Sequence, residues 1–496
     1  MTVNVADLLR PLARSQGDSI ALVSADGETT FRELDLRVRK MATCLLDHGL
    51  RPGSRVAMLL RDNVDHVVTL FAIGSIEAVA IPLDFRSPPA ERRNLAAHFR
   101  VEWMIAPHPF GDLPCIVLDE SWWRKADASK PLSPGTRDGT AQALVMTSSG
   151  TTGRPKGFQL SQTGLFHRLL THQRGFGIEP GDRYLNLAPM YFTAGRNYVV
   201  GHLLFGATVI LGPSLVSPQD IISLVEKHEA NMLFTVPTLC RQLLDMAPAS
   251  TPLLPQMKLL RVGGAAISDE EYLSFVERLT PNTKLVYASS VSGLISVLTT
   301  ADLSKSASTA GRVTPFTDIE IVDDDRRPVG PGEFGRIRVR QPGMAESVCG
   351  LDDESEAREH LDSGWAYPGD LGMLDDGGIL TLRGRYTDTI IRGGANIDPI
   401  EIENVIRQHP EVEDAAVVGV PSPALGQEVV AFVVTQGTLP ADKLQSFCRR
   451  NLAAFKTPSD IVFVCVLPRN TAGKVVKQEL VAAFVADGGT AISSRR

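Results

Sequence analysis

The chain has 496 residues, of which 43% are hydrophobic and 22% charged, and its formal net charge is −7. This length predicts about three domain-sized units with cores of their own. The absence of a long basic run argues against a nucleic-acid partner, and no stretch reaches the roughly 18 uninterrupted apolar residues of a membrane span. The start lacks the pattern of a signal peptide, and no two cysteines form a Cys-x-x-Cys pair, so we expect a cytoplasmic protein.

Strand-like and helical runs alternate between residues 30 and 279. Thr30 and Glu33 have the spacing of a capping box, which predicts an amphipathic helix that begins there and ends near His48. The alternation of strands with helices is typical of a parallel sheet covered by helices. The predicted strands are 55–60, 78–82, 143–146, 232–236 and 259–262, and the further predicted helices are 64–74, 217–228, 237–246 and 268–279.

Residues 147–157 follow the strand-like run 143–146 and read Thr-Ser-Ser-Gly-Thr-Thr-Gly-Arg-Pro-Lys-Gly. Glycines let backbone N–H groups turn toward an anion, and hydroxyls and a lysine add further donors. The string is not a Walker A loop, because Gly157 follows Lys156 where that loop has Ser or Thr. A flexible linker is the alternative, but a linker has no reason to begin on a hydrophobic strand. The predicted phosphate-binding residues are Thr147, Ser148, Ser149, Gly150, Thr151, Thr152 and Lys156.

The pattern changes twice in the second half of the chain. After Gly311, short alternating runs predict a small β subdomain. At Gly384 and Arg385 we place a boundary between domains 1–384 and 385–496, because the part beyond has an α+β pattern long enough for its own core. The predicted strands after Gly311 are 318–322, 335–340, 413–419, 428–435 and 461–466, and the helices are 399–408, 441–452 and one that begins near Lys474.

The loop at 147–157 resembles the phosphate-loop signature of the adenylate-forming superfamily, which includes acyl- and aryl-CoA synthetases, luciferases and peptide-synthetase adenylation domains. Further blocks resemble the family's motifs in the family's order, so the resemblance extends from about residue 20 to residue 482 and is closest to acyl-CoA synthetases. It implies an α/β fold with a large N-terminal domain of two sheet-helix lobes plus a β subdomain. It also implies a small, mobile C-terminal α+β domain.

Small residues follow the predicted strand 259–262. The resemblance implies that Gly264, Ala265 and Ala266 contact adenine, because a flat base can lie against backbone that carries almost no side chains. Tight packing of a strand against a helix would also favour small residues. The run Gly-Gly-Ala-Ala at 263–266 alone therefore leaves both interpretations open.

Residues 287–293 read Tyr-Ala-Ser-Ser-Val-Ser-Gly, where the family has Tyr-Gly-x-Thr-Glu. The resemblance implies that Tyr287 lies against adenine and Ser290 near the phosphates. Val291 stands at the position of the glutamate that holds Mg²⁺, and valine cannot ligate a hard cation. We therefore expect phosphate oxygens and water, with Ser290 or Thr151, to hold Mg²⁺, and we expect an unusually high Mg²⁺ requirement.

Two motifs precede the C-terminal part. The run that ends in Pro368-Gly369-Asp370 resembles Trp-x-x-Thr-Gly-Asp, which implies that Asp370 binds the ribose hydroxyls, although proline replaces threonine. The run 384–397 resembles the hinge of acyl-CoA synthetases. This implies that Arg385 contacts ribose or phosphate, that Thr387 is the pivot, and that Gly393 and Gly394 line a pantetheine tunnel.

The run 467–474 resembles Leu-Pro-x-Thr-x-x-Gly-Lys. In the family that lysine neutralises the charge that develops as a carboxylate attacks the α-phosphate, so Lys474 is the predicted catalytic residue. The run 188–195 resembles a segment with Pro-x-x-His. The resemblance implies an acid pocket that includes Phe192, in the histidine position, together with Gly264 and Ala288. Arg196 and Asn197 either line that pocket or face solvent.

The sequence therefore predicts an acyl- or aryl-CoA ligase that uses ATP and Mg²⁺ to convert a small carboxylic acid to acyl-AMP, and then forms a thioester with coenzyme A. Two alternatives stay open. An acyl-AMP ligase that loads the phosphopantetheine of a carrier protein would share every motif. A catalytically weak nucleotide- or acyl-binding homologue would account for Val291 and Pro368.

Overall fold

The structure is a computed structural model that describes residues 3–486, apart from 112, 134, 136, 149–154, 214–215, 249, 266, 306–308, 352, 394, 436, 438, 470–474 and the side chains of 148, 304, 305 and 396. The chain forms two compact units. One comprises Met1–Ile319 and Arg338–Pro368, and the other comprises Glu320–Ile337 and Gly369–Arg496. The functional boundary that we place at residues 384 and 385 stays a prediction.

The larger sheet of the first unit is parallel at its centre. Its strands follow the order β15-β14-β13-β12-β11-β9-β10-β1-β2, parallel from β13 to β1 and antiparallel at both edges. Parallel strands place their carboxyl ends along one edge, where α/β proteins bind ligands. The bounds are β1 Ile20–Ser24, β2 Gly27–Thr30, β9 Arg183–Asn186, β10 Thr208–Leu211, β11 Met232–Thr235, β12 Leu259–Gly263, β13 Thr283–Ser289, β14 Gly293–Leu298 and β15 Thr309–Val313.

A second sheet of the first unit carries the predicted phosphate loop. Its order is β18-β8-β7-β4-β3-β5-β6, and β7 and β8 pair as an antiparallel hairpin. The apolar run 143–146 is buried in β7, as predicted. The bounds are β3 Arg55–Met58, β4 Val79–Pro82, β5 Trp103–Ala106, β6 Cys115–Val117, β7 Gln142–Ser148, β8 Lys156–Ser161 and β18 Ser347–Cys349.

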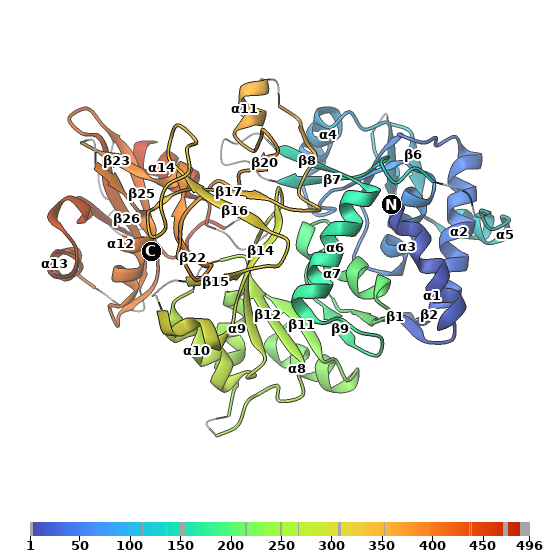
Figure 1. The fold of residues 1–496 in the computed structure, drawn as a ribbon, viewed down its shortest axis with the longest axis horizontal. Helices are drawn as coiled ribbons and strands as arrows, with labels where there is room; N and C mark the ends of the chain where they lie inside the picture. The colour runs from blue at the N-terminus through green and yellow to red at the C-terminus, as the bar shows by residue number, and fades with distance from the viewer. Residues whose placement is uncertain are drawn as a thin grey trace. The chain divides into compact units, whose positions relative to one another are not determined.

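Helix α6 joins the two sheets, because it contacts β14 of the first and both β7 and β8 of the second. It also packs on α7, which lies against β9 and β10 (Figure 1). The bounds are η1 Val5–Leu8, α1 Leu9–Ser15, α2 Phe31–His48, α3 Val64–Ser75, α4 Pro89–His98, α5 Glu120–Ala128, α6 Gln162–Phe176, α7 Thr193–Leu204, α8 Pro218–Lys227, α9 Pro237–Leu244, α10 Asp269–Arg278, η2 Thr300–Lys305 and α11 Glu354–Arg358.

Local sequence explains where several helices begin. Thr30 and Glu33 form the predicted capping box of α2, in which the hydroxyl accepts from the Glu33 amide and the carboxylate accepts from the Thr30 amide. Ser217 caps α8 in the same way, and Ser268 caps α10. Caps of this kind stabilise a helix by about 1 kcal/mol each, because they satisfy amides that have no partner inside the helix.

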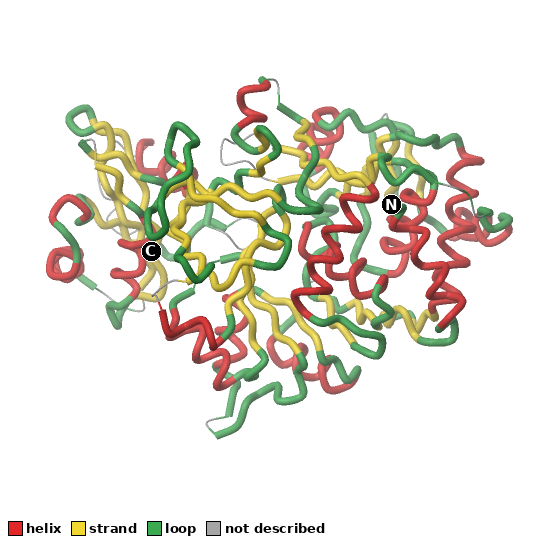
Figure 2. Tube along the Cα trace, in the orientation of Figure 1, coloured by secondary structure: helices red, strands yellow, loops and turns green. Residues whose placement is uncertain are grey.

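The second unit contains a β hairpin and a compact α+β part (Figure 2). In the α+β part the sheet order is β24-β23-β26-β25, and β27 pairs parallel to β26. Separate hydrophobic clusters cover the two faces of this sheet. The bounds are β21 Asp370–Leu374, β22 Ile379–Arg385, η3 Tyr386–Asp388, β23 Ile390–Arg392, β24 Ala395–Ile397, α12 Pro399–Arg407, β25 Val412–Ser422, β26 Gly426–Thr435, α13 Ala441–Asn451, η4 Ala454–Lys456, β27 Asp460–Phe463 and α14 Lys477–Ala486.

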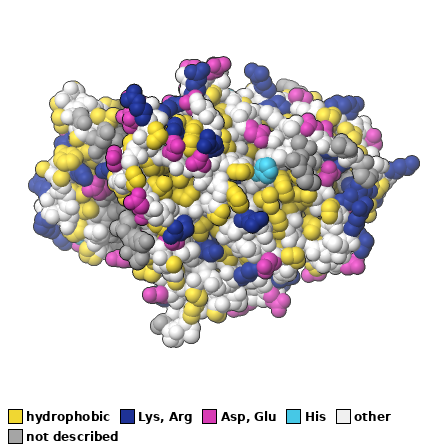
Figure 3. Space-filling view, viewed as in Figure 1, with side chains coloured by type: hydrophobic (Ala, Val, Ile, Leu, Met, Phe, Trp, Pro, Cys, Tyr) yellow, Lys and Arg dark blue, Asp and Glu magenta, His cyan; other side chains and the backbone are white. Residues whose placement is uncertain are grey.

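The architecture confirms the predicted α/β fold. The short strands predicted after Gly311 are present as β16 (Asp318–Val322) and β17 (Gly335–Arg340), and β19 (Leu361–Asp362) and β20 (Trp365–Ala366) form a further small hairpin. The last predicted strand is shorter than expected, since β27 ends at Phe463. No helix in the described part of the chain combines the length and the apolar character that crossing a membrane requires. On the face in Figure 3, Lys and Arg side chains are interspersed with Asp and Glu.

Candidate active site

An exposed shelf of small residues lies at the carboxyl ends of β12 and β13. Gly263, the last residue of β12, is paired with Val286, and a Cβ there would lie 2.7 Å from the Val286 side chain. Close packing therefore explains Gly263. It does not explain Gly264 or Ala265, which are exposed, and Gly264 has a φ of +94° that glycine adopts without strain.

The shelf continues onto β13. Ala288 is exposed beside half-buried Tyr287, and both lie near the end of that strand. The two strand ends thus bring together four of the residues predicted from separate motifs, while Ala266 lies outside the described residues. A flat ligand fits such a surface, because one aromatic side chain stands beside backbone that carries only hydrogen or methyl groups.

The turn between β13 and β14 holds the position where the family has its metal-binding glutamate. Ser290 is half-buried, and its Oγ lies 3.5 Å from the Oγ of Thr193 on α7. Val291 is only 3% exposed, and its side chain belongs to the hydrophobic core. The turn at residues 290–292 therefore carries hydroxyls and no carboxylate, and the oxygens that would hold Mg²⁺ there stay a prediction.

Replacing Val291 with glutamate is expected to destabilise the protein without lowering its Mg²⁺ requirement. The new carboxylate would enter an apolar core, where an unpaired charge is costly. The measurement is the melting temperature together with pyrophosphate release against Mg²⁺ concentration. Val291→Gln is the matched control, because it has the same shape without the charge. A Glu variant that melts like the natural protein and saturates at lower Mg²⁺ would contradict the inward orientation of this side chain.

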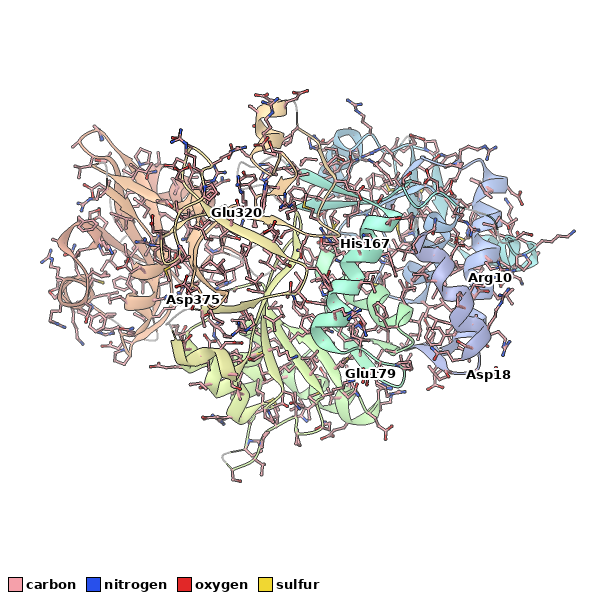
Figure 4. The ribbon with its side chains drawn as sticks, in the orientation of Figure 1. Arg10, Asp18, His167, Glu179, Glu320 and Asp375 are labelled. Carbon is pink, nitrogen blue, oxygen red and sulfur yellow. The ribbon has the colours of Figure 1, made fainter. Side chains whose placement is uncertain are left out.

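A buried arginine that the sequence did not reveal holds this turn in place. Helix α6 carries His167 on its outer side (Figure 4) and turns Arg168 into the core, where it is 1% exposed. Arg168 donates from Nη1 to the carbonyl oxygen of Ser290 at 2.9 Å and from Nη2 to that of Val291 at 3.2 Å. Its Nε donates to the carbonyl oxygen of Gly343 at 2.6 Å. Burial lowers the pKa of Arg168 to about 9, so the guanidinium is still charged near neutral pH.

The phosphate loop is the connection of the β7–β8 hairpin. Thr147 pairs with Gly157, and Ser148 pairs with Lys156, so both ends of the loop belong to strands. This arrangement argues against a flexible linker. A Cβ at Gly157 would lie 2.6 Å from Val145 and 2.7 Å from the sulfur of Cys349, which explains that glycine by close packing. The predicted residues Ser149, Gly150, Thr151 and Thr152 lie outside the described residues, as does the side chain of Ser148.

Two histidines that the sequence analysis missed contact the end of this loop. Lys156 is 7% exposed, and its Nζ donates to Nε2 of His360 at 2.9 Å. Nε2 of His98 donates to the carbonyl oxygen of Pro155 at 2.8 Å. His360 lies 204 residues from Lys156 along the chain, and His98 lies 57 residues from Pro155. No spacing in the sequence could have indicated either pair.

The predicted acid pocket residue Phe192 directly precedes α7 and is half-buried. Its ring centre lies 4.4 Å from that of Tyr191, and the Tyr191 hydroxyl accepts a hydrogen bond from Arg86. The segment thus places two aromatic rings in contact, a half-buried Phe192 and a buried Tyr191, and we call this pair the aromatic wall. Arg196 and Asn197 are 2% and 3% exposed, so neither faces solvent.

In the second unit, Asp370 and Arg385 face each other across the β21–β22 hairpin. They are paired in the strand register, and Nε of Arg385 lies 2.9 Å from Oδ1 of Asp370. Two residues predicted to bind the nucleotide are therefore neighbours. Thr387 is exposed in the short η3 turn, and Gly393 is exposed in the β23–β24 turn. Gly394 and Lys474 lie outside the described residues, and their roles, like those of every site residue named above, stay predictions.

Asp398 is a titratable group close to the predicted hinge. Its carboxylate caps α12 by accepting from the Ile400 amide, and Nε of Arg383 lies 4.0 Å away. Burial raises the pKa of this carboxyl to about 6, against the partial compensation of the cap and of Arg383. The folded protein therefore holds a proton that the unfolded chain releases near pH 4.

Replacing Asp398 with asparagine is expected to stabilise the protein near pH 7. Because the folded-state pKa is raised, the aspartate's contribution is fully present below about pH 4 and is lost as the pH rises through about 6. Asparagine caps a helix equally well and has no charge to bury, so the gain approaches an upper limit of about 3 kcal/mol above pH 6. Melting curves from pH 4 to 8 measure it, and a constant difference between the two proteins at all pH values would refute the argument.

Comparisons with known proteins agree with this arrangement of motifs. Residues 9–348 match the AMP-binding enzyme family, and residues 401–474 match the AMP-binding enzyme C-terminal domain. The chain is 30% identical over 491 residues to a feruloyl-CoA synthase from Amycolatopsis sp, covering 96% of this chain and 98% of the relative. It is 28% identical over 476 residues to the 2-succinylbenzoate–CoA ligase of Bacillus subtilis (strain 168), with coverage of 93% and 95%.

Solved structures of adenylate-forming enzymes have a similar fold. ATP-bound MatB from Rhodopseudomonas palustris has a TM-score of 0.90 at 25% identity, with 99% of this chain and 100% of that chain covered. The o-succinylbenzoate CoA synthetase (MenE) from Bacillus subtilis, in complex with the acyl-adenylate intermediate OSB-AMP, has a TM-score of 0.87 at 25% identity. That match covers 99% of this chain and 98% of the other.

Proposed function

The chain belongs to the AMP-binding enzyme family, within the adenylate-forming superfamily and near the acyl-CoA synthetases, and we propose that it is an ATP-dependent CoA ligase. The observation that carries the proposal is the shelf at the ends of β12 and β13, where Gly264, Ala265, Tyr287 and Ala288 come together in a chain that matches CoA ligases over almost its whole length. In such enzymes one site serves two consecutive reactions.

In the first reaction an oxygen of the substrate carboxylate attacks the α-phosphorus of ATP. The bond between the α-phosphorus and its bridging oxygen breaks, and pyrophosphate leaves with the electron pair. In the second, the sulfur of coenzyme A attacks the acyl carbon, the thiol proton is lost, and AMP leaves. Mg²⁺ supplies positive charge that neutralises the phosphate oxygens. The Oγ of Ser290 lies 3.5 Å from the hydroxyl of Thr193 at the turn where the family places that ion.

Each predicted site residue of this chain would have a separate role. In the first unit, the hairpin loop that begins at Thr147 and ends at Lys156 would hold the phosphates, and Tyr287 would stack on adenine. In the second unit, Asp370 would bind the ribose hydroxyls while Arg385 keeps its carboxylate in position across the hairpin. Lys474 would neutralise charge at the α-phosphate. Movement of residues 385–496 about Thr387 would then exchange Lys474 for the pantetheine surface at Gly393 and Gly394.

An aromatic carboxylic acid is the proposed substrate class. Phe192 and Tyr191 present neighbouring rings next to the first turn of α7, and aromatic side chains favour stacked or edge-on contacts with a second ring. The relatives that are named for feruloyl-CoA and 2-succinylbenzoate act on acids that contain a ring, which supports this choice. An aliphatic acid of equal length would gain less contact from these rings.

The test is pyrophosphate release with a panel of acids, followed by thioester detection with coenzyme A and with a phosphopantetheine-bearing carrier protein. We expect turnover with aromatic acids and transfer to coenzyme A. Turnover only with aliphatic acids would overturn the substrate class. Transfer only to the carrier protein would establish the carrier-loading alternative. If none of the acids in the panel gives pyrophosphate release, a catalytically weak nucleotide- or acyl-binding protein is favoured instead.

A further inference from the structure

Polar side chains are buried where α3, α6 and α7 of the first unit meet. His66 and Thr69 come from α3, Gln162 from α6, and Arg196 and Asn197 from α7, and none is more than 3% exposed. Buried polar atoms almost always have a hydrogen-bond partner. Several atoms here have none among the described residues, namely Thr69 Oγ1, Gln162 Nε2, Arg196 Nε and Nη2, and Asn197 Oδ1.

A small cavity lies among these helices. Its volume is about 30 Å³, and Gln162, Arg196 and Asn197 supply its polar lining. The rest of the wall is apolar and comes from η1, α3, α6, α7 and β7. A space of this size accommodates a water molecule or a monatomic ion.

The positive charge of Arg196 favours an anion over a water molecule in this cavity. Its Nη1 donates to the carbonyl oxygens of Met190 at 3.2 Å and Tyr191 at 3.3 Å, and Nε and Nη2 are left over. No carboxylate of the described residues pairs with it. Burial lowers the pKa of Arg196 to about 9, so it is still protonated at neutral pH.

A second buried arginine lies close to Arg196, and the carboxylate that acts on that pair, Glu346, offsets only part of their effect on each other. Arg168 is equally buried, and the positive charge of Arg196 contributes to lowering its pKa. The pKa of His66 falls to about 4, through burial and then through Arg196. A buried cation without a counter-charge is costly, and hydrogen bonds to backbone carbonyls compensate only part of that cost.

We propose that this cavity binds a chloride ion. Arg196 donates to it from Nε and Nη2, and Gln162 donates from Nε2. The amide of Asn197 turns so that its NH₂ group, rather than Oδ1, faces the ion, since the two ends of an amide exchange places at no steric cost. Water would satisfy the hydrogen bonds equally well, but only an anion neutralises the guanidinium.

The site has a consequence for the neighbouring aromatic wall. Nη1 of Arg196 holds the carbonyl oxygens of Met190 and Tyr191, and Phe192 follows directly. An ion that fixes the guanidinium therefore fixes the segment that carries those rings. This second effect rests on the proposed function, whereas binding of the ion does not.

Two measurements on the full chain test binding of the ion. Crystals grown in sodium bromide should show an anomalous peak within hydrogen-bond distance of Arg196 Nε or Nη2. The melting temperature should rise by about 1–3 °C between about 5 mM and 300 mM sodium chloride, relative to sodium gluconate at equal ionic strength. A water without anomalous signal at this place, together with equal melting curves in the two salts, would overturn the proposal.

Two variants make the result specific. Arg196→Met removes the cation and should abolish both the peak and the chloride response. If that variant does not fold, Asn197→Asp is the informative one, because its carboxylate supplies the missing charge from within the chain. The Asp variant should fold, bind no bromide and melt independently of chloride. An unchanged chloride response in Asn197→Asp would show that the salt acts elsewhere and would refute the site.

Discussion

Replacing Lys474 with alanine is expected to slow adenylate formation by about two to three orders of magnitude, the scale for losing one charge-stabilising group. The reason is the match of residues 467–474 to the family's catalytic loop. Thioester formation from supplied acyl-AMP should largely survive, because in the proposed cycle Lys474 has already left the site. The measurements are pyrophosphate release for the first reaction and thioester formation from synthetic acyl-AMP for the second.

Lys477 provides the matched control. It lies three positions further along, at the start of α14, and its Nζ forms an ion pair with Glu403 at 2.7 Å. Lys477→Ala should therefore affect stability and leave the ratio of the two reaction rates unchanged. An equal loss of both reactions in Lys474→Ala would contradict the exchange of surfaces by domain movement, while leaving the assignment to the family intact.

Replacing Asp370 with alanine is expected to weaken ATP binding about 10- to 100-fold, which corresponds to roughly 1.5–3 kcal/mol for hydrogen bonds to a charged group. The carboxylate is mostly buried and is held by Arg385 across the hairpin. Titration calorimetry with ATP measures the effect, and melting curves establish whether the variant is folded.

The arginine partner allows a sharper test. If Asp370 binds ribose itself and Arg385 positions it, Asp370→Ala and the double variant with Arg385→Ala should bind ATP about equally weakly. Losses that add in the double variant would instead mean that Arg385 contacts ATP independently. Unchanged affinity in Asp370→Ala would remove ribose binding from the list of its roles.

Most of the fold was predictable because its signals are local. The capping box at Thr30 and Glu33 depends on residues three apart, and the strand that precedes the phosphate loop is a single apolar run. Patterns of this kind indicate a helix or strand from residues that lie close together in the sequence. The order of strands in two sheets carries no such local signal and was not predicted, since the resemblance to a family implied only the two sheet-helix lobes, the β subdomain and the small C-terminal domain.

The site was predictable only where a motif carries it. Lys156 could be named from its loop, but its partner His360 is joined to it only by the fold. The same holds for Arg168, which in the sequence is an ordinary arginine within a helix and in the structure is fully buried. From the sequence, Arg196 and Asn197 could either line the acid pocket or face solvent. Both are buried in the structure, which excludes the solvent-facing alternative. Val291 could be recognised as a departure, while its inward orientation could not.

The bonds made by Arg168 bear on how this enzyme could change over time. All three of its donating nitrogens reach main-chain oxygens, at Ser290, Val291 and Gly343, and a carbonyl oxygen is present whatever side chain its residue carries. The bonds that Arg168 makes to the turn at 290–291 thus do not depend on which side chains stand at those two positions. A substitution at 290 or 291 changes a side chain and leaves these carbonyl oxygens in place, so the presence of valine instead of glutamate at 291 does not by itself remove the bonds that hold the turn. Ser290 can therefore be substituted to test its predicted place near the phosphates without loss of the turn, provided that Arg168 is kept.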